Sequence, residues 1–197
     1  MTPLAQPLVS RAEYLALERR ASEKSEYVDG RIYAMAGTSR FHNLIVINIV
    51  RELATQLRDR PCETYASEMR VKVQRTGMYT YPDVVAVCEE PRLEDAELDT
   101  LLNPSVIVEV LSPSTESYDR GEKFAHYRRL ESLREYVLVA QTIRRIEHFR
   151  REGDHWVFTE ISDPDGELAL PSLGCVLRLA DIYQRVDFPA AGSAREG

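Results

Sequence analysis

Two apolar runs enclose a helical segment between residues 105 and 139, and this order constrains the fold more than any other feature. The runs, residues 105–111 and 135–139, are rich in valine, isoleucine and leucine, as buried strands are. The segment between them, about residues 116–131, is long enough for a helix, and Ser114 or Thr115 can cap it. Strand, helix and strand in this order predict a right-handed βαβ unit with parallel strands.

The rest of the chain predicts further helices and antiparallel strands. Ser10 and Glu13 form a capping box that opens one helix, and Asp29-Gly30 predicts a hairpin turn within residues 26–35. Apolar residues at helical spacing predict a long helix from Thr38 or Ser39 to about residue 58. The remaining expected elements are strands at 63–66, 69–73 and 80–87, a hairpin of 144–150 with 155–161, short strands near 168 and 176, and a brief helix at 180–184.

These elements predict an α/β fold: a mixed central sheet flanked by helices, with added antiparallel hairpins. We find neither an internal repeat nor a linker, so we expect one domain over residues 1–197, with a core at about 10–185 and a loose tail at 189–197. The longest apolar stretch, residues 44–50, is too short for a membrane span, and the first ten residues do not resemble a secretory signal. Three cysteines without metal-ligand spacing predict reduced thiols, a cytoplasmic location and no structural zinc.

The charge balance bears on the class of partner. Lys and Arg number 25 against 32 Asp and Glu, a formal net charge of −7. This excludes a basic protein that simply coats nucleic acid, but it does not exclude an enzyme acting on one. Part of the surplus lies in residues 89–99, which we expect to form a solvent-facing loop.

Two carboxylates lie at or within expected strands, one at the start of a strand and one inside a buried strand. Pro82-Asp83 precedes the apolar run 84–87, and a carboxylate at the mouth of a strand can bind a metal without being buried unpaired. Glu109 is the acid within the otherwise apolar run 106–111, so it needs a partner or a function. An arginine partner for Glu109 is the purely structural alternative.

Pro-Asp, then a strand, then an acid within an apolar strand is an order of residues that resembles the PD-(D/E)XK nuclease superfamily. More narrowly, the chain is similar to a large bacterial branch of restriction-endonuclease-like proteins, formerly a domain of unknown function. The resemblance covers roughly residues 10–160, and its ordered set is specific although Pro-Asp alone is not. The matching positions are residues 26–30, the helix with His42, residues 81–87 and 108–115, Asp119, Lys123, Tyr127 and Glu135-Tyr136.

One position departs from the superfamily pattern, which has a lysine two residues after the glutamate where this chain has Leu111. The branch commonly has this substitution, and the resemblance implies that a lysine from the next helix replaces the missing one. Lys123 is the expected substitute, since Lys24 precedes the first strand and Lys72 belongs to a different strand. Asp119, Lys123 and Tyr127 follow one another at one-turn intervals, so they share a helix face. The alternative for Lys123 is a solvated residue paired with Asp119.

The resemblance implies a metal site for phosphodiester hydrolysis. Hard oxygen ligands suit Mg²⁺ or Mn²⁺, with the carboxylates of Asp83 and Glu109 and the main-chain carbonyl of Val110 as expected ligands. Lys123 would orient or help to deprotonate the attacking water and offset phosphate charge. Glu26 is expected to add a ligand, and His42 to contact phosphate or transfer a proton, unless His42 is only a hydrogen-bonded helix residue.

Three functions compete. The first is a Mg²⁺-dependent DNA endonuclease that needs no organic cofactor. The second is a catalytically silent nuclease-like fold that binds DNA or serves assembly, which Leu111 and the negative charge favour. The third is a hydrolase of another phosphate ester. Members of the resembled branch are expected to self-associate, and the paired arms at residues 144–161, with Trp156, predict a homodimer surface.

Overall fold

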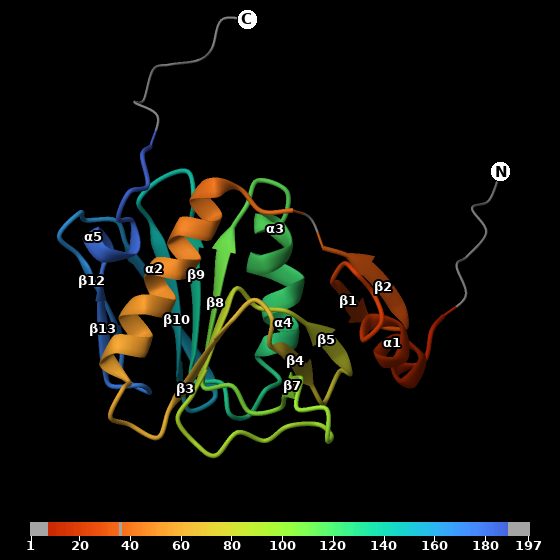
Figure 1. Ribbon diagram of the computed structural model, residues 1–197. Coiled ribbons are helices and arrows are strands. Elements are labelled where there is room, and N and C mark those ends of the chain that lie inside the picture. The colour runs from red at the N-terminus through yellow and green to blue at the C-terminus, as the bar shows by residue number, and fades with distance from the viewer. Residues whose placement is uncertain (1–7, 36, 189–197) are drawn as a thin grey trace, which may run out of the picture.

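The computed structural model describes residues 8–35 and 37–188, and a six-stranded sheet forms its centre (Figure 1). The strand order is β11-β10-β9-β8-β6-β3, in which β8 and β9 are parallel and the other neighbours are antiparallel. The strands are β3 (Glu63–Ala66), β6 (Val84–Val87), β8 (Val106–Leu111), β9 (Glu135–Ala140), β10 (Ile146–Glu152) and β11 (His155–Ile161). The predicted βαβ unit and mixed α/β fold are therefore confirmed. The tail expected at 189–197 lies outside the described residues.

A second, five-stranded sheet lies beside the first. Its order is β2-β1-β5-β4-β7, and β7 (Thr100–Leu101) was not expected from the sequence. The other strands are β1 (Ser25–Val28), β2 (Arg31–Ala34), β4 (Arg70–Val73) and β5 (Met78–Thr80). The β1–β2 turn has Asp29 and Gly30 at φ of 47° and 81°, the left-handed region that aspartate tolerates and glycine favours. The hairpin predicted from Asp-Gly is confirmed.

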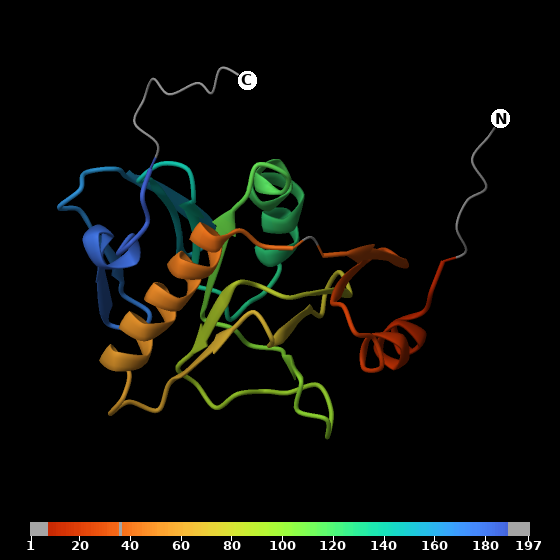
Figure 2. The same cartoon turned by 45° about the horizontal axis from the view of Figure 1, so that its top comes forward.

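Helices cover both faces of the central sheet (Figures 1 and 2). The long helix α2 (Arg40–Gln56) lies on one face, beside α5 (Leu179–Ile182) and the hairpin of β12 (Glu167–Leu170) and β13 (Cys175–Arg178). The opposite face carries α3 (Glu116–Tyr118), a π-helical turn η1 (Asp119–Lys123) and α4 (Phe124–Tyr127). Helix α1 (Arg11–Glu18) packs at the far end against β1, with the predicted capping box between Ser10 and Glu13.

Side chains of β8 alternate between the two faces of the central sheet, so the strand packs against both helical layers. Val106, Val108 and Val110 belong to the apolar cluster beneath α2, whereas Ile107 and Leu111 belong to the cluster beneath α4. Successive strand residues point to opposite faces, so a strand buried on both sides reads as a continuous apolar run. Glu109 therefore points toward the α3–η1–α4 layer.

Two predicted elements are corrected. The single strand expected at 80–87 is two strands in different sheets, because residues 81–83 leave the ladder, and Pro82 has no N–H to donate to it. The helix expected at 116–131 ends at Tyr127 and contains η1, whose wider π-type turn carries Asp119 and Lys123. Such turns are frequent at functional sites.

The expectation of three reduced cysteines is wrong for two of them. Cys62 and Cys88 form a disulfide, and Cys175 is a free, buried cysteine. The reason lies in the register: Glu63 pairs with Val87, so the next residues outward, Cys62 and Cys88, face each other across strands β3 and β6. Pairing between strands 26 residues apart is not readable from cysteine spacing.

The acidic segment 89–99 is not simply a solvent-facing loop. Arg19 binds Asp95 at 2.8 Å and Asp99 at 2.9 Å, and the buried Arg70 binds Asp99 at 2.6 Å. Lys72 forms an ion pair with Glu94. These contacts attach the segment to α1 and β4.

Across residues 8–35 and 37–188, no helix combines the length and apolar character needed to cross a bilayer.

Candidate active site

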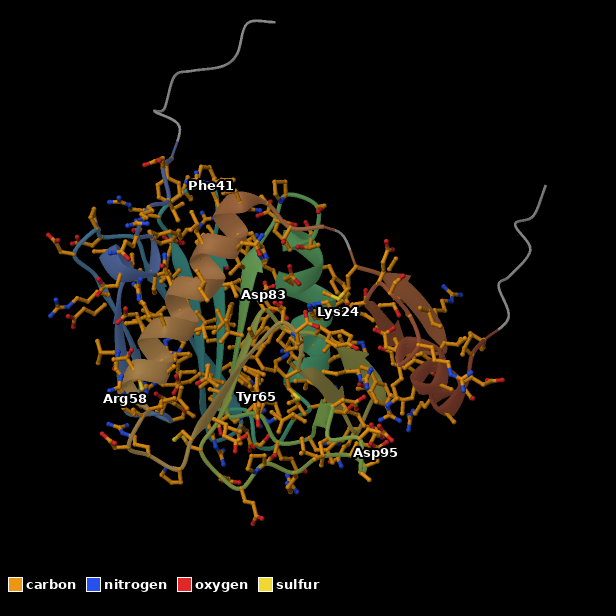
Figure 3. The ribbon with its side chains drawn as sticks, viewed as in Figure 1. Lys24, Phe41, Arg58, Tyr65, Asp83 and Asp95 are labelled. Carbon is orange, nitrogen blue, oxygen red and sulfur yellow. A yellow bond between two sulfur atoms is a disulfide. The ribbon has the colours of Figure 1, made fainter. Side chains whose placement is uncertain are left out.

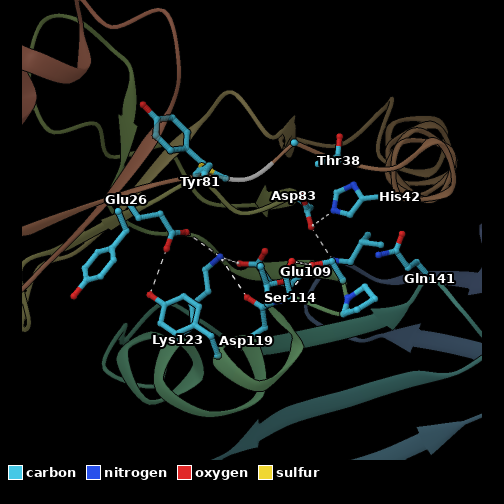
Figure 4. A pocket seen from close by; sticks show the side chains of 18 of the residues that line it. Glu26, Thr38, His42, Tyr81, Asp83, Glu109, Ser114, Asp119, Lys123 and Gln141 are labelled. Carbon is cyan, nitrogen blue, oxygen red and sulfur yellow. Dashed lines mark hydrogen bonds and ion pairs between the residues drawn. The ribbon is translucent and has the colours of Figure 1, made fainter.

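A pocket of about 660 Å³ opens where β6 and β8 meet the start of α2 and the α3–η1 layer (Figure 4). Figure 3 shows Asp83 between helix α2 and the α3–η1–α4 layer. Its acidic side chains come from elements far apart in the sequence, and a lysine lies among them. These residues are Glu26, Asp83, Glu109, Asp119, Glu122 and Lys123. The structure thus brings together all the side chains that the sequence proposed for the site, including His42.

Strand register brings Asp83 and Glu109 together. The antiparallel ladder of β6 and β8 begins with the pair Val84 and Val108, so Asp83 directly precedes one paired residue and Glu109 directly follows the other. The main-chain N–H of Val110, the next residue after Glu109, donates to Asp83 Oδ2 at 2.8 Å and holds the two carboxylates near each other. Two carboxylates separated by 25 intervening residues therefore share one side of the pocket.

Asp83 is held by two contacts through one oxygen. Its Oδ2 accepts a hydrogen bond from the Val110 main-chain N–H at 2.8 Å and lies 3.1 Å from His42 Nε2. His42 is on the first turn of α2, where the side chain of the N-cap residue Ser39 accepts its backbone N–H. The start of α2 thus fixes the histidine beside the carboxylate. Val110, expected to offer its carbonyl, also contributes its N–H.

Lys123 is buried among carboxylates. Its Nζ lies 2.9 Å from Glu109 Oε1, 3.0 Å from Glu26 Oε1 and 3.6 Å from Asp119 Oδ1. Only 5% of the residue is exposed, so the alternative of a solvated lysine is wrong. The alternative of an arginine partner for Glu109 is also wrong within the described residues, since its cation is Lys123.

Hydroxyl groups orient the buried glutamates. The Tyr127 hydroxyl donates to Glu109 Oε1 at 2.8 Å. Thr80 donates to Glu26 Oε1, and the Tyr118 hydroxyl donates to Glu26 Oε2 at 3.3 Å. Each glutamate is therefore held in one orientation by groups from other elements. Thr80 and Tyr118 were not expected at the site, and a hydroxyl residue in a strand or helix gives no sequence signal for this role.

Burial and charge act together on the ionisable groups. Burial raises the pKa of Glu109 well above its usual value, against the effect of Lys123 and with that of Asp119 and Asp83. Burial likewise raises the pKa of Asp119. Burial alone would lower the pKa of Lys123, but Glu109, Glu26 and Asp119 raise it well above its usual value. The Lys123 ammonium therefore stays charged within the cluster.

The other two lysines, and Glu135 and Tyr136 of the resemblance, lie outside the carboxylate cluster. Lys24 binds Glu68 at 2.8 Å and Lys72 binds Glu94, so neither of the other two lysines contacts these carboxylates. Glu135 pairs with Val106, at the end of β8 away from Glu109, and accepts the Ser172 N–H at 2.8 Å. Tyr136 supports the site indirectly, since its hydroxyl donates to the Asp119 carbonyl at 2.9 Å.

Gln141 is a further polar residue of the pocket that the sequence did not predict. Gln141 follows β9 directly, lines the pocket and hydrogen-bonds Ser39. A signal existed, because residues after neighbouring parallel strands meet at the same edge of a sheet. The residues after 111 and after 139 therefore had to lie near each other.

The residues fit a hard divalent cation. Asp83 Oδ1 and Glu109 Oε2 accept no hydrogen bond from the described residues, whereas the other oxygen of each carboxylate is engaged. Across those same residues, no preformed group of three or more histidine, cysteine or acidic side chains surrounds a metal position. Mg²⁺ needs only one or two carboxylates and retains several waters, so this donor set suits it better than it suits zinc.

Comparison with known proteins agrees with this geometry. The profile of the Uma2 family, described as "Putative restriction endonuclease", matches residues 11–180. The chain belongs to the Uma2 family. Membership supports a nuclease-like function. It also confirms the family resemblance, from which Lys123 was expected to replace the lysine missing at Leu111.

Two similar proteins come from Synechocystis sp. (strain ATCC 27184 / PCC 6803 / Kazusa). Uncharacterized protein sll1609 is 39% identical over 162 residues, 82% of this chain and 92% of that protein. Uncharacterized protein slr1290 is 36% identical over 183 residues, 92% of this chain and 95% of that protein. These matches extend over nearly the full length of both relatives.

A solved structure supports the fold. The crystal structure of a putative nuclease belonging to DUF820 from Anabaena variabilis ATCC 29413 has a TM-score of 0.74 with this Uma2 chain at 18% sequence identity. The match covers 89% of this chain and 97% of the Anabaena chain. At this identity the likeness establishes the restriction-endonuclease-like fold alone.

Proposed function

We propose that this protein is a metal-dependent phosphodiester hydrolase, a DNA endonuclease that uses Mg²⁺ or Mn²⁺ without an organic cofactor. The observation that carries the proposal is the position of Lys123, whose Nζ lies 2.9 Å from Glu109 in a pocket that also contains Asp83. A buried ammonium beside two carboxylates suits phosphodiester hydrolysis, because the carboxylates can hold a metal ion and the ammonium can offset charge on the phosphate. Membership of the Uma2 family supports the same reaction class.

The chain's own residues have separable roles in this mechanism. Asp83, fixed by Val110 N–H and His42, and Glu109, fixed by Tyr127, would hold the cation through their free oxygens. The carbonyl of Val110 is the proposed third ligand. The bound cation supplies Lewis-acid stabilisation of charge on the phosphate.

Lys123, Glu26 and His42 would stabilise charge and transfer protons. Lys123 would orient the attacking water and offset the negative charge of the pentacovalent phosphate. Glu26 would hold Lys123 in place and supply a further oxygen ligand. His42, 3.1 Å from Asp83, would contact phosphate or carry a proton to the leaving oxygen.

The test is cleavage of plasmid DNA with and without Mg²⁺ or Mn²⁺. We expect metal-dependent cleavage by the native chain and its loss in Asp83→Asn and Glu109→Gln, with exposed Asp59→Asn and Glu23→Gln as matched controls. Cleavage by both site variants at the native rate would contradict the proposal.

A matched calorimetric titration separates the competing functions. Carboxylate-dependent metal binding together with DNA cleavage supports the hydrolase. DNA binding without metal binding would favour the catalytically silent nuclease-like fold. Leu111 and the net charge of −7 are the sequence features that favour this alternative. Cleavage of small phosphate esters but not of DNA would favour a different esterase.

The homodimer remains a prediction, and β11 is the proposed contact. This strand forms one edge of the six-stranded sheet, with Val157 39% exposed and Phe158 53% exposed. Edge strands with exposed apolar side chains pair readily with another chain. Sedimentation velocity should give a dimer for the native chain and a monomer for Phe158→Glu. The single domain and the cytoplasmic location likewise stay predictions.

A further inference from the structure

Gln141 presents an unused hydrogen-bond donor to the pocket. The residue is 8% exposed, and its Oε1 accepts a hydrogen bond from the Ser39 hydroxyl at 2.5 Å. The same Ser39 oxygen accepts the His42 backbone N–H at 3.1 Å, so both functions of that hydroxyl are engaged. Within the described residues, Gln141 Nε2 has no acceptor. Figure 4 shows the amide across the pocket from Lys123.

The Gln141 amide is fixed at its oxygen by Ser39, and its nitrogen is open to the pocket, since Nε2 is not among the fully buried atoms without a partner. Such a donor is satisfied by water in the free protein, and an acceptor oxygen of a ligand can replace that water. Gln141 lines the same pocket as the carboxylates, but its NH₂ group can only donate. The oxygen atoms of a phosphate are acceptors of the matching kind.

The surroundings of Gln141 favour an anion. Ser39 is the N-cap of the 17-residue helix α2, whose first N–H groups and positive dipole end lie at this side of the pocket. Hydroxyl groups of Thr38, Ser114 and Thr115 also line it. The carboxylates around Lys123 lie across the pocket from Gln141, and Asp83, which contacts His42, lies between the two groups. The pocket thus has a Lys123 side and a Gln141 side.

Strand register sets the spacing between these two sides. Ala140 pairs with Leu111 in the parallel β8–β9 ladder, so Gln141 lies level with Ser112, three residues beyond Glu109. Three strand residues span about 10 Å. Gln141 is therefore displaced along the sheet from Glu109, and its place suits a phosphate next to the one that Glu109 would face.

We propose that Gln141 is a positioning residue that donates from Nε2 to a non-bridging oxygen of a backbone phosphate next to the scissile one. Ser39 fixes the amide in the orientation that this bond requires. The ligand is the phosphodiester backbone of a nucleic acid, read without regard to base. This inference rests on the proposed function, because it assumes that a nucleic acid enters the pocket.

The experiment measures binding of a labelled DNA oligonucleotide in an Asp83→Asn background, which blocks cleavage. Gln141→Glu keeps the acceptor for Ser39 but removes both donors and adds a charge that repels phosphate. We expect it to weaken binding about tenfold or more, and Gln141→Ala about tenfold, because hydrogen bonds to charged groups are strong. Gln74→Ala, at an exposed turn, is the matched control and should bind normally.

A methylphosphonate scan locates the contact. Replacing one phosphate by a neutral methylphosphonate should weaken binding to the Asp83→Asn protein at one linkage beside the scissile position. The same linkage should have no effect once Gln141→Ala is added. A purely structural role for Gln141 would weaken binding without removing the dependence on that linkage. Thermal melting of each variant checks folding, and Ser39→Ala replaces any Gln141 variant that does not fold.

The outcomes are distinct from those of the proposed function. DNA binding that depends on Gln141 in a protein that never cleaves DNA would support this inference and reject the hydrolase. DNA cleavage with unchanged binding by folded Gln141→Glu, or an identical methylphosphonate profile in Gln141→Ala, would overturn the inference alone. Absence of DNA binding by the native chain would overturn it as well.

Discussion

The Lys123 ammonium lies 2.9 Å from Glu109 Oε1, although 13 residues and a π-helical turn separate the two positions in the chain. Leu111 is on the same face of β8 as Glu109 and is buried in the apolar cluster beneath α4. The strand position where the superfamily pattern has its lysine therefore serves packing, and the next helix supplies the charge. Moving the lysine from position 123 to position 111 tests this relationship.

Removing Lys123 should strongly reduce cleavage, and placing a lysine on the strand at position 111 should restore part of the activity. We expect Lys123→Met to reduce metal-dependent cleavage at least 10²-fold, because the charge-stabilising group is lost. Leu111→Lys combined with Lys123→Met should recover measurable activity, since position 111 lies two residues along the same face. Single-turnover cleavage checks both, with Lys24→Met as control. Full activity in Lys123→Met would exclude Lys123 from the reaction.

Tyr127 should influence metal affinity through Glu109. Its hydroxyl donates to Glu109 Oε1 at 2.8 Å, so Tyr127→Phe removes one hydrogen bond and leaves the ring packed. Loss of such a supporting contact typically weakens metal binding by 10- to 100-fold. We expect about a tenfold weaker Mg²⁺ affinity by calorimetry and a loss of about 1 kcal/mol in the free energy of unfolding. Unchanged affinity would show that Tyr127 only fills space. Tyr65→Phe is the control.

Asp99 should stabilise the fold in a pH-dependent way. Hydrogen bonds from Arg19 and then Arg70 hold the pKa of Asp99 well below its usual value of 3.8. A lowered folded-state pKa means that the contribution is fully present above the ordinary carboxyl pKa and is lost as the pH falls through the folded one.

Asp99→Asn should therefore cost about 2 kcal/mol near neutral pH, because it also leaves the buried Arg70 without its carboxylate. The difference from the native chain should shrink as the pH falls below 3.8. Urea unfolding at pH 6 and pH 3 measures it, with Asp59→Asn as control. A constant difference at both pH values would contradict the assignment.

The Cys62–Cys88 disulfide should stabilise the edge of the central sheet. It closes a loop with a sequence separation of 26, for which loss of chain entropy in the unfolded state predicts about 3 kcal/mol. Reduction and the double change Cys62→Ser with Cys88→Ser should lower the free energy of unfolding by similar amounts. Thiol titration of the unreduced, denatured chain should detect Cys175 alone. Three titratable thiols would contradict the pairing.

Local sequence rules correctly predicted most of the elements. The capping box at Ser10, the Asp29-Gly30 turn and the apolar run 106–111 depend on neighbours in the chain, so they could be read directly. The break at residues 81–83 and the π turn at Asp119 could not, because which of two sheets a strand joins and how a helix winds depend on what each packs against.

The sequence by itself indicated the candidate site residues: an acid within an apolar strand, a Pro-Asp before another, and a lysine at helical spacing from Asp119. Only the tertiary structure decided how they meet. The β6–β8 ladder brings Asp83 close to Glu109, burial raises the pKa of Glu109, and β9 carries Gln141 to the edge of the pocket. Distances between segments remote in the chain follow from strand pairing and layer packing, which no local pattern of residues specifies.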